Sequence, residues 1–163
     1  MTNSSRTRPI AGAIWIPVLL LIIGQSATAA ESDDERAART LVESFLTAVG
    51  DGNLDALPDM FVSDANIGTA SLRAGTWITS TMTFDEWMAS LRERTEWNRF
   101  SEPVSEYTIH VEDSVMAFVR ADATLVMDGQ PRSRNIDYFT LVRENGAWKF
   151  LSASYVARPI GPD

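Results

Sequence analysis

The chain has 163 residues, which is the length of a single domain, and it contains no cysteine. Its 22 acidic residues outnumber its 14 lysine and arginine residues, which gives a formal net charge of −8 at pH 7. Nucleic acids and anionic membrane surfaces are bound by clustered lysine and arginine, so this composition argues against both as partners.

The first 29 residues have the three parts of a secretory signal peptide. Arg6 and Arg8 form a basic region, residues 10–23 are apolar, and the small residues Ala-Thr-Ala-Ala occupy positions 27–30. We therefore expect removal of residues 1–29 and export of the remainder to the periplasm or the cell exterior. The alternative is a retained anchor, although the apolar run is shorter than the roughly 20 residues of a transmembrane helix. After cleavage the protein would have no membrane contact, because only this segment provides one.

The residues that follow predict a helix. Ser32, with Glu35 three residues later, forms a capping-box pattern at a helix start. Apolar residues then recur at 3.6-residue spacing from Ala38 to Val49, which predicts an amphipathic helix that ends at Gly50-Asp51-Gly52. A second, shorter helix is predicted over residues 54–61, limited by an internal proline.

The region after this second helix has weaker patterning. Residues 63–67 are expected to form a short extended segment. Residues 68–82 are rich in threonine, serine and glycine, which favours an irregular loop at the mouth of any pocket. Thr83 and Glu86 then form a second capping box, and the apolar residues behind it predict a helix that ends before Pro103.

Beyond Pro103 the apolar period changes from helical to alternating, which predicts β-strands. The connection Asn145-Gly146 is the strongest hairpin signal, because a type I′ turn needs a positive φ at both central residues. Helices followed by an antiparallel meander predict an α+β fold, with the N-terminal helices packed on the sheet. The four predicted strands cover residues 104–111, 115–127, 132–143 and 147–157.

The second of these strands indicates an internal space. Ala117, Ala121 and Ala123 share a face with Val119, and such small side chains leave room between a sheet and the helices that cover it. This pattern favours a ligand pocket. The alternative is that tryptophan side chains fill the space, the candidates being Trp77, Trp87, Trp97 and Trp148.

Three segments carry a resemblance to a known family: the first helix with its turn (FLTAVGDGNLDAL), the segment MFVSDA, and the last hairpin (IDYFTLVRENGAWKF). They are similar to the nuclear transport factor 2-like superfamily, in its SnoaL-like branch. The resemblance covers Arg36–Ala157 and implies helices on a curved antiparallel sheet, in a cone around an internal pocket. Superfamily members include isomerases, dehydratases, transport factors and accessory domains, so the fold alone assigns no activity. The predicted organisation is a signal peptide over 1–29, a polar lead-in over 30–35, the domain over 36–158 and a C-terminal tail over 159–163.

Ketosteroid isomerase, a member of this superfamily, offers a test of one activity. Its tyrosine that donates to the oxyanion falls on Phe45, and its general-base aspartate falls on or near Thr69. Its second oxyanion donor, an aspartic acid, falls on Asp137. Only one of the three catalytic residues of ketosteroid isomerase therefore has a counterpart in this sequence. Without the general base and the tyrosine phenol, ketosteroid isomerase chemistry is not expected.

Asp137 is the best candidate for a functional residue. On an alternating strand it shares a face with Asn135 and Phe139, the face that the superfamily turns inward. Burial would favour the neutral carboxyl group, which could donate a hydrogen bond to a ligand or act as an acid or base. The alternative is a structural ion pair with Arg73 or Arg120.

Aromatic residues complete the predicted ligand-binding set, which is Asp137, Asn135, Phe139, Phe45, Trp77 and Trp97. A pocket lined by such residues would hold an apolar molecule or a flat ring, although a core position is the favoured prediction for each tryptophan taken singly. His110 is the single histidine, and its alternation with Ile109 and Val111 favours an exposed or sheet-edge position. With no cysteine and no paired metal-ligand spacing, we expect neither a metal site nor a cofactor.

Two classes of function remain. The first is an exported, non-catalytic domain that binds a small apolar or aromatic ligand or a protein partner. The second is a cofactor-independent isomerase or lyase that uses Asp137, which the missing base near Thr69 disfavours. The superfamily also implies a homodimer formed through the outer face of the sheet, where Met116, Phe118 and Tyr138 would form an apolar patch.

Overall fold

A computed structural model of the chain describes residues 30–161. The predicted signal peptide over 1–29 lies outside the described residues. The compact unit that carries the fold is Glu31–Asp163. Within the described range, no helix combines the length and the apolar character needed to cross a membrane.

The first helix, α1 (Asp33–Asp51), begins and ends where the sequence signals place it. Both hydrogen bonds of the predicted capping box form between Ser32 and Glu35, so the helix already includes the last three residues of the predicted lead-in. At the other end Gly52 has φ 74°, and its N–H caps the carbonyl groups of the last turn. Glycine adopts this conformation without a steric penalty.

The predicted helix over 54–61 is replaced by two short 3₁₀ turns, η1 (Leu54–Ala56) and η2 (Pro58–Met60). Pro58 cannot donate a backbone hydrogen bond, which prevents a continuous helix here. The next helix, α2 (Phe84–Arg92), is confirmed together with the capping box between Thr83 and Glu86.

The prediction of an irregular loop over 68–82 is wrong. The chain forms a long hairpin there, with strands β1 (Phe61–Arg73) and β2 (Thr76–Thr83). Ala74 and Gly75 both have positive φ, the backbone conformation of a tight hairpin turn. Strand β2 is almost entirely exposed, so it lacks the alternation of apolar residues by which a half-buried strand is recognised.

All four predicted strands after Pro103 are present, and a short additional strand precedes them. The turns at Asp128-Gly129 and Asn145-Gly146 have positive φ at both residues, as the hairpin signals require. The strands are β3 (Phe100–Ser101), β4 (Val104–Glu112), β5 (Met116–Met127), β6 (Gln130–Glu144) and β7 (Ala147–Pro159).

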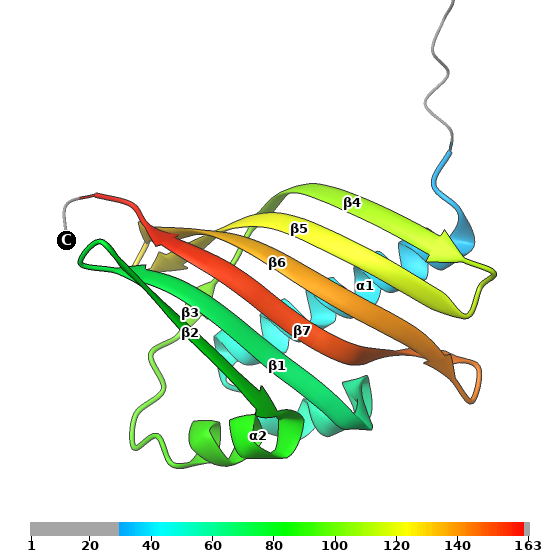
Figure 1. Ribbon diagram of the computed structural model, residues 1–163, viewed down its shortest axis with the longest axis horizontal. Helices are drawn as coiled ribbons and strands as arrows, with labels where there is room; N and C mark the ends of the chain where they lie inside the picture. Colours follow the sequence, from blue (N-terminus) through cyan, green and yellow to red (C-terminus); the bar gives the residue numbers. More distant parts are fainter. Residues whose placement is uncertain (1–29, 162–163) are drawn as a thin grey trace, which may run out of the picture. The chain divides into compact units, whose positions relative to one another are not determined.

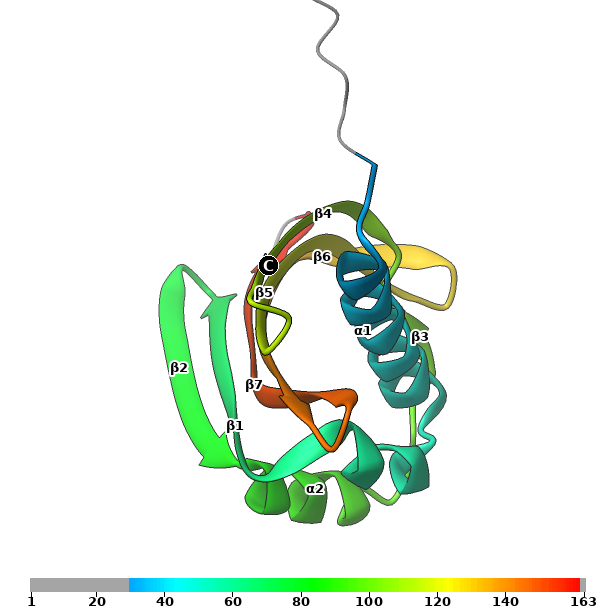
Figure 2. The ribbon, with the colours of Figure 1, turned by 90° about the vertical axis from the view of Figure 1, so that its right-hand side faces the viewer.

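The seven strands form one sheet in the order β2-β1-β7-β6-β5-β3, with β4 also paired to β5. Neighbours are antiparallel except for β1 and β7, which are parallel, so the sheet is mixed rather than purely antiparallel. The sheet curves, and Figure 2 shows α1 and α2 on its concave side. In Figure 1 the strand β7 runs through the middle of the sheet, although it is the last strand in sequence.

The core lies between the concave face and the helices, and aromatic side chains dominate it. Phe150 is completely buried, and its ring centroid lies 4.8–5.3 Å from those of Phe45, Phe61 and Phe139. Phe84 stacks on Phe61 with the ring centroids 4.3 Å apart. This cluster joins both helices to the sheet and so fixes the distance between them.

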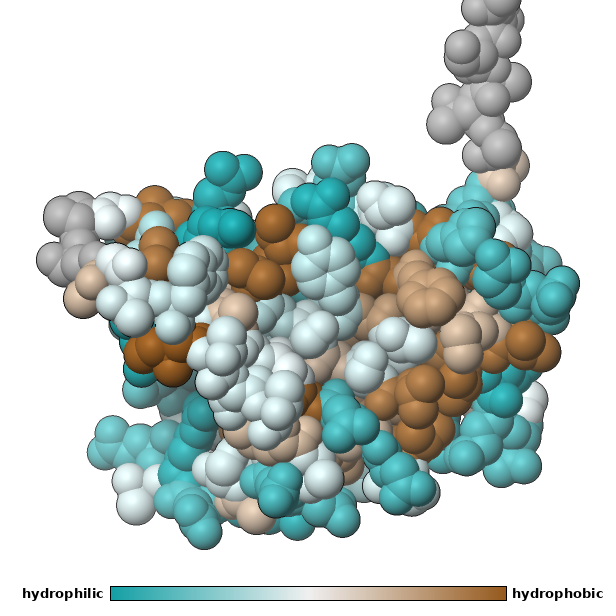
Figure 3. All heavy atoms as spheres, in the orientation of Figure 1, coloured by the Kyte–Doolittle hydropathy of each residue, from teal (hydrophilic) through white to brown (hydrophobic). Residues whose placement is uncertain are grey.

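The convex face of the sheet carries the predicted dimer patch. In Figure 3 side chains of intermediate hydropathy cover the middle of this face, hydrophobic ones lie among them, and hydrophilic ones lie mainly at the rim. Phe118 and Tyr138 are each 46% exposed there, and Met116 is partly buried. A homodimer through this face stays a prediction.

Candidate functional site

A cavity of about 440 Å³ lies between the concave face of the sheet, the two helices and the segment that follows α2. This volume is within the range of small-molecule sites. Phe45, Leu46 and Val49 line it from α1, Trp87 and Leu91 line it from α2, and the remaining wall comes mainly from the sheet. An internal space therefore exists and the tryptophans do not fill it, but it does not lie above the small residues that predicted it. Ala117, Val119 and Ala121 belong to the packed core, and β5 lines the cavity with Leu125 and Met127 instead.

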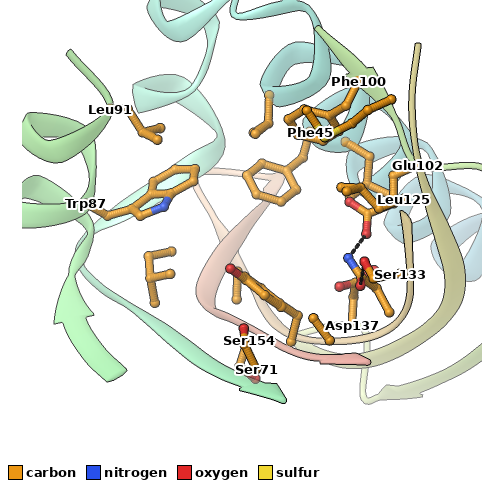
Figure 4. Close-up of a pocket in the computed structure, with 18 of the residues that line it drawn as sticks. Phe45, Ser71, Trp87, Leu91, Phe100, Glu102, Leu125, Ser133, Asp137 and Ser154 are labelled. Atoms are coloured by element: carbon orange, nitrogen blue, oxygen red, sulfur yellow. Dashed lines mark hydrogen bonds between the residues drawn. The ribbon is translucent and has the colours of Figure 1, made fainter. Parts of the chain in front are cut away.

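The wall formed by β6 supplies the polar groups. Ser133, Asn135, Asp137 and Phe139 alternate along the strand and share the concave face, as the two-residue period predicts. Asn135 is 7% exposed and Asp137 is 4% exposed. Figure 4 shows Ser133, Asp137 and Glu102 on one side of the cavity, with Trp87 and Leu91 on the opposite side.

A chain of hydrogen bonds organises this polar side. The Ser133 hydroxyl donates to Oδ1 of Asn135 at 2.8 Å. The amide Nδ2 of Asn135 donates in turn to Oε1 of Glu102. These contacts use the amide group of Asn135 for internal bonding, so Asn135 fixes Glu102 beside the cavity. Sequence reasoning identified Asn135 but missed Glu102, which lies in a non-periodic stretch between β3 and β4.

Asp137 differs from its neighbours because its Oδ2 atom is buried without a hydrogen-bond partner. Burial, followed by the charges of Glu102 and Asp122, raises the pKa of Asp137 to about 8. Burial also raises the pKa of Glu102, against the hydrogen bond from Asn135, which lowers it. Burial thus favours the neutral form of Asp137, which can donate a hydrogen bond as well as accept one.

The alternative structural role of Asp137 is wrong, because the predicted ion pairs do not form. Arg120 instead binds Asp122, with 2.7 Å between Nη2 and Oδ1. No salt bridge in the described part of the chain involves Asp137. The residue opposite Asp137 on β7 is Tyr155, which also lines the cavity, and burial raises the pKa of its phenol.

Aromatic rings form the apolar walls. The Phe45 ring lies edge-to-face with Phe139 at 5.8 Å between centroids, and Trp87 lies 6.1 Å from Phe45. Trp97 lines the cavity as predicted, and its indole N–H donates to the carbonyl of Gly50 at 3.4 Å. Sequence reasoning named Trp87 only as a possible core residue, since helical spacing cannot separate a core ring from a pocket ring.

Trp77 does not line the cavity, so its predicted place in the pocket is wrong. It lies on the edge strand β2 and is 46% exposed, with the guanidinium of Arg158 5.3 Å from its ring centroid. The prediction rested on an irregular segment at the cavity mouth, and the segment is a hairpin instead. The irregular segment that does line the cavity comes after α2 and includes Arg94, whose guanidinium lies 5.3 Å from the Trp97 ring centroid.

Gly52 supports the position of Trp97 and gives a testable prediction. A Cβ atom at Gly52 would lie 2.7 Å from Cδ1 of Trp97, and φ is also positive there. We expect Gly52→Ala to cost about 1 kcal/mol for the backbone conformation and more for displacing Trp97. Urea denaturation and tryptophan emission would measure both effects.

The matched control is Gly129→Ala, since Gly129 has nearly the same φ of 71° and no atom within 4 Å of an added Cβ. This variant should lose only the stability that the backbone conformation costs, and its tryptophan emission spectrum should be unchanged. Equal losses of stability and equal spectra for the two variants would show that Gly52 does not hold Trp97 in place.

The remaining sequence candidates lie outside this polar cluster. Thr69, at the position of the isomerase base, faces Tyr155 across the β1–β7 pair and supplies no carboxylate. His110 is exposed on the edge strand β4, where its Nε2 lies 2.7 Å from Oε1 of Glu112, as the sequence favoured. Within residues 30–161 no three histidine, aspartate or glutamate side chains are grouped as a metal site would need.

Comparison with known proteins identifies relatives of this fold. Residues 33–156 match the model of the family Lumazine_bd_2, described as "putative lumazine-binding". No curated protein matches the chain.

Solved structures match at low sequence identity. An NTF2-like protein from Silicibacter pomeroyi is 20% identical, with a TM-score of 0.52 over 76% of this chain and 94% of its own. A protein with a cystatin-like fold from Nostoc punctiforme is 14% identical, with a TM-score of 0.63 over 78% and 93%. A protein described as a putative scytalone dehydratase from Novosphingobium aromaticivorans is 20% identical, with a TM-score of 0.55 over 78% and 93%. These likenesses confirm the nuclear transport factor 2-like fold.

Proposed function

Because the chain belongs to the Lumazine_bd_2 family of small-ligand-binding domains, we propose that its cavity binds a flat, largely apolar ring compound. In this proposal the ring lies among the aromatic side chains and Asp137 forms a hydrogen bond with one polar edge of it. The observation that carries the proposal is a cavity of about 440 Å³ with aromatic side chains on one side and the buried Asp137 on the other.

Asp137 lines the cavity and forms no salt bridge with the residues that the structure describes. Its carboxyl group is therefore free to serve as a polar partner for a ligand on the β6 side of the cavity. The opposite side of the cavity carries the apolar and aromatic side chains of Phe45, Trp87 and Leu91, which suit the face of a ring. Lumazine, a bicyclic pteridine dione, is flat and carries polar edges, and it is the compound with which the proposal is tested.

We expect lumazine to bind saturably and to change the tryptophan emission, because Trp87 and Trp97 line the cavity. Trp97→Phe should weaken binding by roughly tenfold through the loss of ring contact, a change of about 1.4 kcal/mol. Fluorescence or calorimetric titration of the purified domain would measure it.

The matched control is Trp77→Phe, which removes an exposed indole away from the cavity and should leave the affinity unchanged. Two outcomes would contradict the proposal. One is the absence of saturable binding by lumazine and related flat heterocycles. The other is an equal loss of affinity in the two tryptophan variants.

The alternative function is catalysis by Asp137 in a cofactor-independent isomerase or lyase. The observation in its favour is the pKa of about 8, which allows Asp137 to exchange a proton near neutral pH. It needs a second group, and Thr69 at the isomerase-base position cannot supply one. Recovery of a chemically unchanged ligand after prolonged incubation with the protein would reject this alternative for that ligand.

The proposal also places the protein outside the cytoplasm, in the periplasm or beyond the cell. Its support is the pattern of charge, apolar run and small residues over 1–29. Sequencing of the exported protein should find Ala30 or Glu31 at its N-terminus. A membrane-bound form that retains Met1 would instead indicate an anchor.

A further inference from the structure

We propose that the ring compound carries a positively charged nitrogen, in an ammonium group, and that this group lies against Glu102 and Asp137. The inference rests on the proposed function and names the charge of the compound that the same cavity accepts. The charged side chains of the cavity wall support it, together with the apolar side chains opposite them.

Two carboxyl groups on the polar side of the cavity form no ion pair within residues 30–161. Glu102 is partly buried and Asp137 is 4% exposed, and both line the cavity. Neither takes part in a salt bridge with a described residue. After burial, the charge of Glu102 is the next cause of the raised pKa of Asp137, so the two carboxyl groups interact. A ligand beside them therefore meets acidic groups that no ion pair balances.

Basic side chains are scarce in the cavity wall. Of the described residues that line the cavity, Arg94 alone is basic. It is exposed, and its guanidinium lies 5.3 Å from the ring centroid of Trp97. The exposed Glu96 follows on the same segment and also lines the cavity, so the charge of Arg94 is offset there. Arg94 therefore leaves the inner carboxyl groups without a counter-charge.

A second cavity, of about 410 Å³, shares Leu46, Phe100 and Glu102 with the first. Glu43 and Asp51 also line it, whereas no lysine, arginine or histidine from the described part of the chain does. Glu102 thus has further acidic side chains on its other side. Clustered charge of one sign in a cleft attracts a ligand of the opposite sign.

Glu102 is also positioned to accept a hydrogen bond from such a ligand. The amide Nδ2 of Asn135 donates to Oε1 of Glu102, which leaves Oε2 for another donor. Burial raises the pKa of Glu102 and this hydrogen bond lowers it, and a cation beside the carboxyl group would favour the ionised form further. An ammonium group has three N–H donors and no acceptor, so it can donate to Glu102 and Asp137 together.

The other polar groups of the lining are compatible with either charge. Ser71, Ser154 and Tyr155 carry hydroxyl groups and Asn98 carries an amide, and each can accept a hydrogen bond as well as donate one. These residues allow a cation to bind but do not select it, and the selection comes from the carboxyl groups.

The apolar side of the cavity then determines where the ring lies. Trp87 and Leu91 lie across the cavity from Glu102 and Asp137 (Figure 4). A ring that packs against Trp87 and Leu91 directs a substituent on its far edge toward the two carboxyl groups. A compound with an aromatic ring at one end and an ammonium group at the other fits both sides.

The test compares naphthylmethylamine with naphthylmethanol, both substituted at the same ring carbon. The two compounds have nearly the same shape, but at neutral pH the first ends in an ammonium group and the second in a neutral hydroxyl group. We expect the wild-type protein to bind the amine roughly tenfold more tightly, which is the difference that a hydrogen bond to a charged group makes. Calorimetric titration would measure both affinities.

Glu102→Gln removes the charge of Glu102 and keeps an oxygen that accepts the hydrogen bond of Asn135, so it should bind the two compounds with nearly equal affinity. The matched control is Glu106→Gln, which changes the net charge by the same amount at an exposed position on β4 outside the cavity lining. This control should keep the preference for the amine. Circular dichroism would show that each variant is folded, and the wild-type comparison tests the inference without either variant.

The outcomes distinguish this inference from the proposed function. If the wild type binds the two naphthalene compounds equally, or binds the alcohol more tightly, the cavity binds rings but the inference of a cation is overturned. A preference for the amine that survives in Glu102→Gln, or that is lost equally in Glu106→Gln, also overturns it. Binding of lumazine without binding of the amine has the same meaning. If none of the three compounds binds, the proposed function itself fails.

Discussion

Asp137→Asn is expected to stabilise the domain at pH 8 and to change its stability little at pH 4. The pKa of Asp137 is about 8 in the folded protein, above its ordinary value of 3.8. Between these two values the unfolded chain releases the proton and the folded protein keeps it, so the free energy of unfolding falls as pH rises. The stabilising contribution is complete below pH 3.8 and is lost by pH 8.

The expected size is large because about four pKa units separate the two states. Each unit corresponds to about 1.4 kcal/mol, so about 6 kcal/mol is an upper bound for the gain in Asp137→Asn at pH 8. Asparagine cannot ionise and has the shape of the neutral acid, so the variant should show a much flatter pH profile. Urea denaturation at pH 4, 6 and 8 would measure both proteins.

The control for this experiment is Asp64→Asn, which changes an exposed aspartate on β1. It should follow the wild-type profile, because this side chain is exposed and does not belong to the buried cluster around Asp137. A stability difference between Asp137→Asn and wild type that does not grow from pH 4 to pH 8 would show that Asp137 is ionised in the folded domain.

Phe150→Ala is expected to destabilise the domain by about 3–5 kcal/mol, which is a large part of the stability of a domain of this size. Phe150 is fully buried, and its ring contacts those of Phe45, Phe61 and Phe139. Its removal leaves a space between α1 and β7 that rigid neighbouring rings cannot close. Thermal and urea denaturation would measure the loss.

Leu151→Ala is the matched control, since Leu151 is the next residue on β7 and is 36% exposed. A substitution at such an exposed position should change the stability by no more than about 0.5–1 kcal/mol. Comparable losses in the two variants would show that the aromatic cluster is not the centre of the core.

Much of this fold could be predicted from local signals. The two capping boxes depend only on residues three positions apart, and both form as predicted. The strand pairs after Pro103 follow from alternation and from turn residues that accept positive φ. The hairpin over Phe61–Thr83 was missed because β2 is an exposed edge strand, where no buried face imposes a pattern. The parallel pairing of β1 with β7 has no local signal, since it joins residues about 85 positions apart, such as Ile67 and Ala153.

The residues of the candidate site could likewise be predicted only in part. Asp137, Asn135 and Phe139 could be placed on the inner face because they alternate on a well-marked strand. Glu102 could not, because only the assembled sheet brings it within hydrogen-bonding distance of Asn135. Trp77 was misplaced because its strand was not recognised.

The central place of β7 has a consequence for how the chain is made. This strand follows the six others in the sequence, yet it joins β1 on one side and β6 on the other. The β1–β2 hairpin and the strands β3 to β6 therefore cannot be united until residues 147–159 have been synthesised, and folding must wait for contacts between distant parts of the sequence. A ribosome-bound polypeptide that stops short of β7 is thus expected to lack the finished core, with the concave face of its sheet incomplete.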